Sequence, residues 1–185
     1  MNSVEAARQL MMMSAALLPV PVEREKEDEV KEDDDSARPM IDSIMLANSW
    51  NLLDHTAEAY DLLKLCRLKG TKIHLGGIFA SGILVGGNTY NYKTVDSNSP
   101  VFSKVQRWKT LCLKYNVELP IAAIGFSLLF DEVDSICIGV RSVAELSEVT
   151  SWFELSRTIP KALWKDAKSE GILSPHIELP FDSND

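Results

Sequence analysis

The stretch that decides the fold is residues 42–77, which read DSIMLANSWNLLDHTAEAYDLLKLCRLKGTKIHLGG. Residues 42–48 form a short apolar run that predicts a buried strand. Apolar residues then recur at helical spacing from Ala57 to Lys69, and Gly70 fits the position just after a helix end. Because a second apolar run follows from Thr71 to Gly77, this stretch predicts a strand–helix–strand unit.

The rest of the chain continues this alternation after a glycine-rich loop over residues 76–87. The expected elements are a helix over 100–115, a helix over 121–130, a strand over 135–140, a helix from 142 and a last helix over 160–171. The helix from residue 142 opens with a capping box, Ser142 to Glu145, and is expected to turn Leu146, Val149 and Phe153 inward. Such an order predicts an α/β fold with parallel strands, as a doubly wound sheet or a barrel.

The charge and hydropathy of the sequence limit the kinds of partner that we expect. The net charge of the 185 residues is −8, and residues 23–38 hold nine acidic and four basic side chains. Residues 1–40 are therefore expected to be disordered, as a solvated spacer or as an acidic arm that binds a partner. The negative charge disfavours nucleic acid. The longest nearly apolar run, residues 119–130, is shorter than the roughly 20 residues that cross a bilayer, so we expect no membrane span and a cytoplasmic protein.

The cysteines and histidines predict no metal site. They are Cys66, Cys112, Cys137, His55, His74 and His176. No CxxC pair occurs, and no two histidines have the spacing of metal ligands. Because they lie in apolar contexts, we expect the three cysteines to be buried free thiols.

Three motifs and a tail carry a family resemblance. They are LANSWNLLDH at 46–55, GGIFASGIL at 76–84, IGVRSVAEL at 138–146, and IPKALW at 159–164 followed by EGIL at 170–173. In this order they resemble the aldo/keto reductase superfamily, and within it the branch of D-threo-aldose (L-fucose) and pyridoxal dehydrogenases. The resemblance implies the C-terminal portion of a (β/α)₈ TIM barrel, with the three strands as its sixth, seventh and eighth. The expected organisation is an acidic segment over 1–40, a partial NADP-dependent oxidoreductase domain over 41–178 and a flexible tail over 179–185.

The resemblance also implies a site for a nicotinamide dinucleotide, NADP or NAD, at the carboxyl ends of the strands. Asn48 would bind the nicotinamide carboxamide there, or would only cap its own loop. The glycine-rich loop is neither a P-loop nor a GxGxxG motif. Its Ser81 and the backbone N–H groups around it would bind the pyrophosphate. The implied contacts of this loop are Phe79, Ser81, Gly82 and Leu84.

After the third strand, the implied contacts lie around the adenosine ribose and, in NADP, its 2′-phosphate. They are Gly139, Arg141, Ser142 and Glu145. Ser142 would bind the phosphate, cap the helix or do both. Glu145 stands where many NADP-preferring relatives have Arg, so it either favours NAD or only completes the capping box. Ala80 and Val149 replace asparagines that are frequent in the family, so a contact is expected to be missing at each.

Catalytic residues are not expected in this chain. In the family an Asp, Tyr, Lys and His from early strands assist the transfer of hydride between cofactor and carbonyl, and residues 1–40 contain no Tyr and no His. Tyr90 and Tyr92 follow the second strand without an Asp–Tyr–Lys pattern around them. We therefore expect a partial and inactive member of a family that acts on aldoses or similar carbonyl and alcohol substrates. The alternative is a non-catalytic interaction or regulatory protein, built on a half-barrel with an acidic tail.

Overall fold

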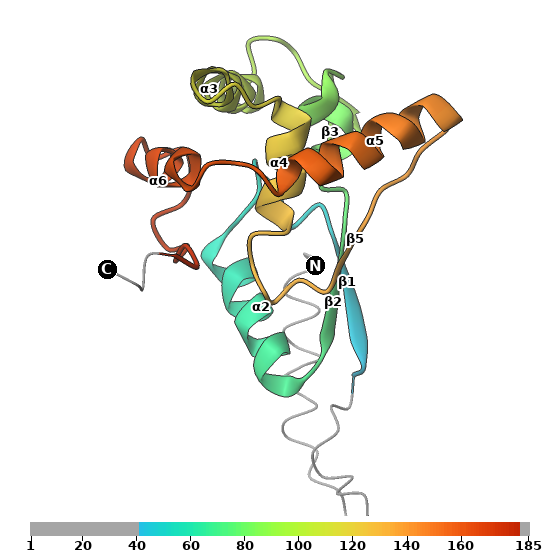
Figure 1. The fold of residues 1–185 in the computed structure, drawn as a ribbon, viewed down its shortest axis with the longest axis vertical. Coiled ribbons are helices and arrows are strands. Elements are labelled where there is room, and N and C mark those ends of the chain that lie inside the picture. Colours follow the sequence, from blue (N-terminus) through green and yellow to red (C-terminus); the bar gives the residue numbers. More distant parts are fainter. Residues whose placement is uncertain (1–40, 182–185) are drawn as a thin grey trace, which may run out of the picture.

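The computed structural model describes residues 41–181. The elements in chain order are β1 (Ser43–Ala47), α2 (Ala57–Lys69), β2 (Lys72–Gly76), the 3₁₀ helix η2 (Ala80–Val85), β3 (Thr89–Tyr90), β4 (Lys93–Thr94), α3 (Pro100–Lys114), α4 (Leu119–Ser127), β5 (Ser135–Cys137), α5 (Val143–Ser156) and α6 (Lys161–Ser169). In Figure 1, α2 runs alongside the sheet and the later helices gather around its upper end. The disorder expected for residues 1–40, and residues 182–185 of the expected tail, lie outside the described residues.

The sheet confirms the predicted α/β architecture with parallel strands. Its order is β1–β2–β5, and both pairings are parallel. Parallel neighbours need a crossover connection, which α2 supplies between β1 and β2 and the segment with α3 and α4 supplies between β2 and β5. Within the described residues, the outer edges of β1 and β5 have no strand beside them.

Both ends of α2 are capped, at Gly70 as predicted and at Thr56, which the sequence analysis did not single out. The Thr56 hydroxyl oxygen caps the start by accepting a hydrogen bond from the Ala59 N–H at 3.3 Å. At the other end, Gly70 has a left-handed φ of 70°, and its N–H donates to the Arg67 carbonyl at 3.2 Å. The buried side chains of α2 are Ala59, Tyr60, Leu62, Leu63 and Cys66. They therefore form the helix face that packs toward β2.

An aromatic cluster fixes the loop that follows β1. Trp50 is 1% exposed and stacks on Tyr60 and Phe126 with ring centroids 5.8 and 5.4 Å away. It also meets Phe130 edge-on at 5.3 Å. Since Tyr60 lies on α2 and Phe126 on α4, this cluster holds the loop between two helices at the carboxyl end of β1.

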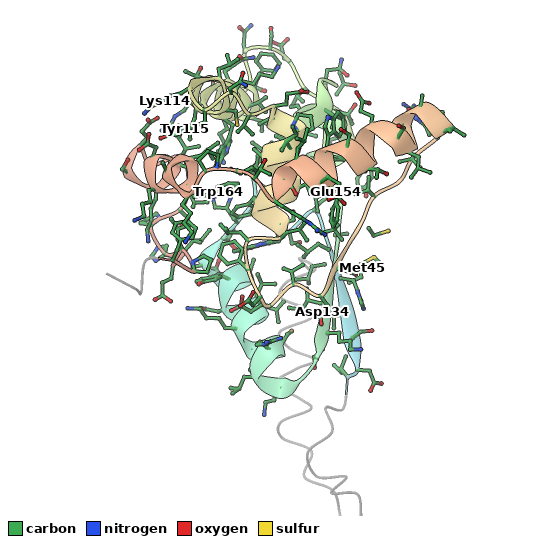
Figure 2. All side chains as sticks on the ribbon, viewed as in Figure 1. Met45, Lys114, Tyr115, Asp134, Glu154 and Trp164 are labelled. Carbon is green, nitrogen blue, oxygen red and sulfur yellow. The ribbon has the colours of Figure 1, made fainter. Side chains whose placement is uncertain are left out.

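The two faces of the sheet differ in exposure. Leu46, Ile73 and Leu75 are buried against the helices. The opposite face stays open within residues 41–181, and its Met45 is 60% exposed and points away from the helices (Figure 2). On this open face the His74 ring lies 2.7 Å from the Ser135 hydroxyl, so the histidine is satisfied by a neighbouring strand.

Two predicted elements end earlier than expected, for different reasons. β5 has three residues instead of the expected run over 135–140, because its pairing partner β2 ends at Gly76 and Gly77 turns away with a φ of +68°. α4 ends at Ser127 instead of Phe130. The chain must turn there toward β5, and the Asp134 N–H already donates to the Ile73 carbonyl at 2.9 Å.

The inward face predicted for α5 is partly wrong. Leu146 is 53% exposed, whereas Val149 and Phe153 are half-buried as predicted. The orientation of α5 follows from a close approach to α4, because a Cβ on Gly125 would lie 3.5 Å from the Ser156 carbonyl and 2.4 Å from the Ile159 side chain. Ser156 is buried at this contact, whereas Leu146, near the other end of α5, is not.

Three further features depart from the sequence predictions. The β3–β4 hairpin and the 3₁₀ helix η2 lie in what was expected to be an irregular loop. Cys137 is exposed, while Cys66 and Cys112 are buried free thiols as expected. Leu179 is 1% exposed and belongs to the core, so the packed region extends past the predicted boundary at residue 178.

Candidate functional site

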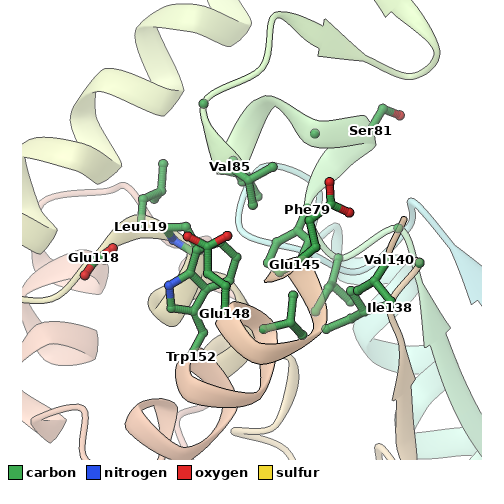
Figure 3. Close-up of a pocket in the computed structure, with 18 of the residues that line it drawn as sticks. Phe79, Ser81, Val85, Glu118, Leu119, Ile138, Val140, Glu145, Glu148 and Trp152 are labelled. Atoms are coloured by element: carbon green, nitrogen blue, oxygen red, sulfur yellow. The ribbon is translucent and has the colours of Figure 1, made fainter. Parts of the chain in front are cut away.

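The loops that follow β1, β2 and β5 meet at one cleft. Parallel strands place their carboxyl ends at the same edge, so Asn48, residues 77–86 except Ala80 and Ile83, and residues 138–141 line a common cavity of about 1200 Å³ (Figure 3). The connection between α3 and α4 and the first turns of α5 complete its lining. The volume exceeds slightly the range of roughly 300–1,000 Å³ that is usual for small-molecule sites.

Asn48 enters the cleft from the end of β1 in a strained conformation. Its φ is 54°, and its N–H donates to the Gly76 carbonyl at 3.0 Å. Its side-chain oxygen Oδ1 is buried and has no hydrogen-bond partner. Gly77 makes room for this amide, because a Cβ at position 77 would lie 2.0 Å from Oδ1. The result is an unsatisfied acceptor at the edge of the cleft.

The loop after β2 is strained over three successive residues. Ala80, Ser81 and Gly82 have φ values of 48°, 61° and 101°. For residues other than glycine this region costs about 1 kcal/mol or more, and such strain concentrates at ligand sites. The Ser81 hydroxyl oxygen accepts from the Tyr92 N–H at 3.2 Å, so its own hydrogen remains able to donate.

The backbone N–H groups of this loop are less available than the sequence suggests. The Gly82 and Leu84 N–H groups both donate to the Phe79 carbonyl, at 2.9 and 3.3 Å. The Leu84 side chain is fully buried in the core. Phe79 is half-buried and meets Trp152 of α5 edge-on, with centroids 6.0 Å apart. The loop therefore offers the Ser81 hydroxyl and an aromatic wall rather than a cradle of free amides.

Arg141 and Glu145 form a closed pair at the start of α5. The Glu145 carboxylate accepts from the Arg141 backbone N–H at 2.7 Å and from the Arg141 guanidinium at 2.9 Å. Hydrogen bonds from Arg141 lower the pKa of the Glu145 carboxyl, and the bond from the backbone N–H has the larger effect. The Ser142 hydroxyl caps α5 by accepting from the Glu145 N–H at 3.1 Å, which confirms the predicted helix cap. In a capping box the Glu145 carboxylate would accept from the Ser142 N–H, whereas here it accepts from the N–H of Arg141, one residue earlier.

Eight of the nine residues predicted for cofactor binding line this one cleft. They are Asn48, Phe79, Ser81, Gly82, Leu84, Gly139, Arg141 and Glu145. Ser142 is the exception, since it caps α5 outside the lining. Residues that the sequence did not single out also line the cleft. They include Lys109 of α3, Asn116 and Glu118 of the connection between α3 and α4, and Glu148 and Trp152 of α5, none of which belongs to a family motif. Figure 3 shows Glu145, Glu148 and Trp152 facing Phe79 and Val85.

Two tyrosines have acidic partners that sequence spacing did not reveal. The Tyr90 hydroxyl donates to Asp54 at 2.6 Å, and the Tyr115 hydroxyl donates to Asp166, which also pairs with Lys114. Burial is the main cause that raises the pKa of Tyr90, and the hydrogen bond to Asp54 raises it further. The bond to Asp166 raises the pKa of Tyr115, which lies on the outer surface between α3 and α6 (Figure 2). Neither hydroxyl lines the cleft, and both pKa shifts oppose proton donation.

His55 is held in one tautomer beneath the aromatic cluster. Its Nδ1 lies 3.0 Å from the Asn51 carbonyl and therefore donates, whereas Nε2 accepts from the Ser174 N–H at 3.3 Å. Burial is the main cause that lowers the pKa of His55. Its role is thus to join the loop after β1 to the C-terminal segment.

Residues 41–181 contain neither a candidate metal site nor a helix suited to cross a membrane. No group of three or more His, Cys, Asp or Glu side chains is placed to hold a metal ion in this part of the chain. None of its helices has the length and apolar character needed to cross a membrane.

The geometry defines an α/β protein with a cleft at the carboxyl edge of a parallel sheet. Comparison with known proteins makes the class specific. A sequence model of the aldo/keto reductase family matches residues 28–166, starting 13 residues before the predicted domain boundary at 41. The chain belongs to the aldo/keto reductase family, and the resemblance stated from the motifs is confirmed.

Two curated relatives show how much of the family's length is present. The chain is 34% identical over 136 residues to pyridoxal 4-dehydrogenase of Microbacterium luteolum, covering 72% of this chain and 39% of that protein. It is 29% identical over 131 residues to D-threo-aldose 1-dehydrogenase of Pseudomonas sp, covering 68% and 38%. The chain therefore spans about two fifths of the length of the curated relatives it matches.

Proposed function

We propose that this chain supplies the cofactor-binding side of an aldo/keto reductase barrel, and that its cleft binds a nicotinamide dinucleotide. The observation that carries the proposal is the convergence of three βα loops on one cleft, which brings together eight residues that the family resemblance implies for the cofactor. When bound, the nicotinamide supplies a hydride donor or acceptor. The substrates would be carbonyl or alcohol compounds such as the aldose and the pyridoxal in the relatives' names.

The residues of the cleft fit such a cofactor in chemistry. The unsatisfied Oδ1 of Asn48 suits the N–H₂ group of a carboxamide. The Ser81 hydroxyl and Arg141 are donors of the kind that phosphates accept from. Phe79 and Trp152 offer apolar ring surface for a flat base. Each of these groups binds or orients the cofactor.

The proton-transfer part of the reaction is proposed to depend on residues outside this cleft. Tyr92 is the tyrosine that lines it, and its side chain is 82% exposed rather than held between partners. A general acid needs positioned neighbours that lower its pKa toward the working pH. We therefore expect the described residues to bind cofactor without turning over an aldose by themselves.

The direct test is a titration of the purified full chain with NADH, followed by the quenching of tryptophan fluorescence. Trp152 lines the cleft, so the quenching should be weaker in Trp152→Phe. Asn48→Ala should weaken binding about fivefold, the worth of one hydrogen bond of ~1 kcal/mol. The matched control is Asn98→Ala, which removes an exposed amide away from the cleft. An affinity that is the same in both variants, or no saturable quenching by the wild-type chain, contradicts the proposal.

A second function, association with a partner, is favoured by the open face of the sheet. This face carries the exposed Met45, and the strand edges beside it have no neighbour within the described residues. Sedimentation of the full chain tests it with Met45→Asp and the control Leu68→Asp, since Leu68 is an 81% exposed residue of α2. A complex that only Met45→Asp disrupts supports association, and a wild-type monomer that binds NADH contradicts it.

A further inference from the structure

A second cavity, of about 100 Å³, shares no lining residue with the cleft. Three segments enclose it, namely the loop after β1, the middle of α3 and the turn that follows α6. Small-molecule sites usually measure roughly 300–1,000 Å³, and one water molecule occupies about 30 Å³ in the liquid. This cavity therefore has room for a single group of a few heavy atoms, and it is too small for a nucleotide.

The charged part of the lining of this cavity is cationic. Lys104 and Arg107 stand three positions apart on α3, which places them on the same face of the helix. No Asp or Glu occurs among the described residues that line the cavity. Within residues 41–181, no ion pair or hydrogen bond engages the Lys104 ammonium group. The cavity thus brings two positive charges together without a carboxylate to neutralise them, in a chain whose net charge is −8.

Two hydrogen bonds hold the walls of the cavity in place. The Arg107 guanidinium donates to the Glu170 carbonyl at 2.6 Å, which ties α3 to the turn after α6. A guanidinium carries five N–H donors, so Arg107 can still donate to a ligand. The Trp108 Nε1–H donates to the Leu52 carbonyl at 2.8 Å, which ties α3 to the loop after β1. Because these walls are already fixed, a ligand would order few further groups when it binds.

The remaining lining is apolar on one side and open on the other. Leu52 and Trp108 are buried, and both ring nitrogens of His55 already have backbone partners. A Cβ on Gly171 would meet no atom within 4 Å, and the two cations are exposed. A ligand can therefore enter from solvent, and the donors that it meets are those of Lys104 and Arg107.

We propose that this cavity binds one tetrahedral oxoanion, as inorganic phosphate or as the phosphate end of a small metabolite, between Lys104 and Arg107. A phosphate accepts several charge-assisted hydrogen bonds at once, and the planar guanidinium matches its oxygens in pairs. The anion relieves the repulsion between the two cations and bridges α3 to the segments on either side of it. Since both cations are exposed and screened by salt, the dissociation constant is on the order of 1 mM.

The experiment follows the melting temperature (Tm) of the full chain while sodium phosphate replaces sodium chloride at constant ionic strength and pH 7. Phosphate also stabilises folded proteins non-specifically, because it is excluded from their surface. The readout is therefore the difference between the wild type and Lys104→Gln, which lacks one of the two cations. The matched control is Lys109→Gln, because Lys109 lies on the same helix but lines the cleft. A parallel series with glycerol 3-phosphate distinguishes free phosphate from the phosphate end of a metabolite.

At 10 mM phosphate we expect Tm to rise by roughly 3–6 °C more in the wild type and in Lys109→Gln than in Lys104→Gln. An equal rise in all three proteins shows only the non-specific effect and overturns the proposal. A rise that Lys109→Gln loses and Lys104→Gln keeps places the anion in the cleft, which overturns the proposal as well.

His55 supplies a second readout, at the cavity itself and in the wild-type chain. Burial is the main cause that lowers the pKa of His55, the hydrogen bond to Asn51 raises it, and the charge of Lys104 lowers it again. The Asp54 carboxylate acts in the opposite direction to Lys104. An anion beside Lys104 should therefore raise the pKa of His55, as measured by NMR of its ring protons with and without phosphate. A pKa of His55 that phosphate leaves unchanged overturns the proposal, even if Tm rises.

Discussion

Replacing Gly77 with alanine should damage the cleft more than it damages the fold. Gly77 has a φ of +68°, a conformation that costs an alanine about 1–2 kcal/mol. The added Cβ would also lie 2.0 Å from Oδ1 and 2.8 Å from Cγ of Asn48, so the Asn48 side chain must leave its position. The backbone cost acts on stability, whereas the displacement acts on the group proposed to hold the carboxamide.

Gly171 provides a control that isolates the second effect. Its φ is +62°, close to that of Gly77, and a Cβ there would have no atom within 4 Å. Gly171→Ala should therefore lose the same 1–2 kcal/mol in the free energy of unfolding, as measured by urea denaturation. Gly77→Ala should show this loss and, in addition, bind NADH roughly tenfold more weakly, which corresponds to about 1.4 kcal/mol.

Either of two results would contradict this prediction. If Gly171→Ala weakens NADH binding as much as Gly77→Ala does, the loss comes from general destabilisation. If Gly77→Ala keeps the wild-type affinity for NADH, the position of Asn48 has no part in binding. The NADH affinity of both variants needs to be measured without urea, at a pH and temperature where more than nine tenths of each protein is folded.

Three further predictions concern the pH response, the thiols and a helix cap. The pKa of His55 is lowered from its ordinary value of 6.5, so unfolded chains take up this proton at a higher pH than folded ones. The contribution of His55 to stability is therefore complete above pH 6.5 and is lost as the pH falls through the lowered pKa. Urea titrations from pH 7.5 to 5 should show a decline in the free energy of unfolding. His55→Asn should reduce this decline, and the control His176→Asn, at an exposed position, should not. Cys137 is exposed and lines the cleft, so it should react first with a thiol reagent and be protected by NADH. The two buried cysteines should react only on unfolding. Equal reaction rates for all three thiols would contradict this prediction. Ser142→Ala removes the N-cap of α5 and should lower the free energy of unfolding by about 1 kcal/mol, with little effect on NADH binding because Ser142 lies outside the lining; a selective loss of affinity would instead restore its predicted contact with the cofactor.

The sequence alone determined those features whose cause is local. The ends of α2 follow from Thr56 and Gly70, and the start of α5 follows from Ser142, because a cap depends on neighbours within one helical turn. The parallel order of the strands also followed from the alternation of strand and helix. The family motifs then identified three of the loops that line the cleft, since these motifs sit at the ends of strands and parallel strands bring those ends together.

Only the tertiary structure decided what depends on segments distant in the chain. The spacing within α5 does not reveal that the helix packs against α4 through Ser156 and Gly125 while Leu146 stays exposed. Lys109 and Glu118 reach the cleft from α3 and its connection to α4, so the charge balance of the site could not be read from the motifs. Periodicity encodes which residues of one element share a face, whereas packing determines which other element that face meets and which polar groups are left without a partner.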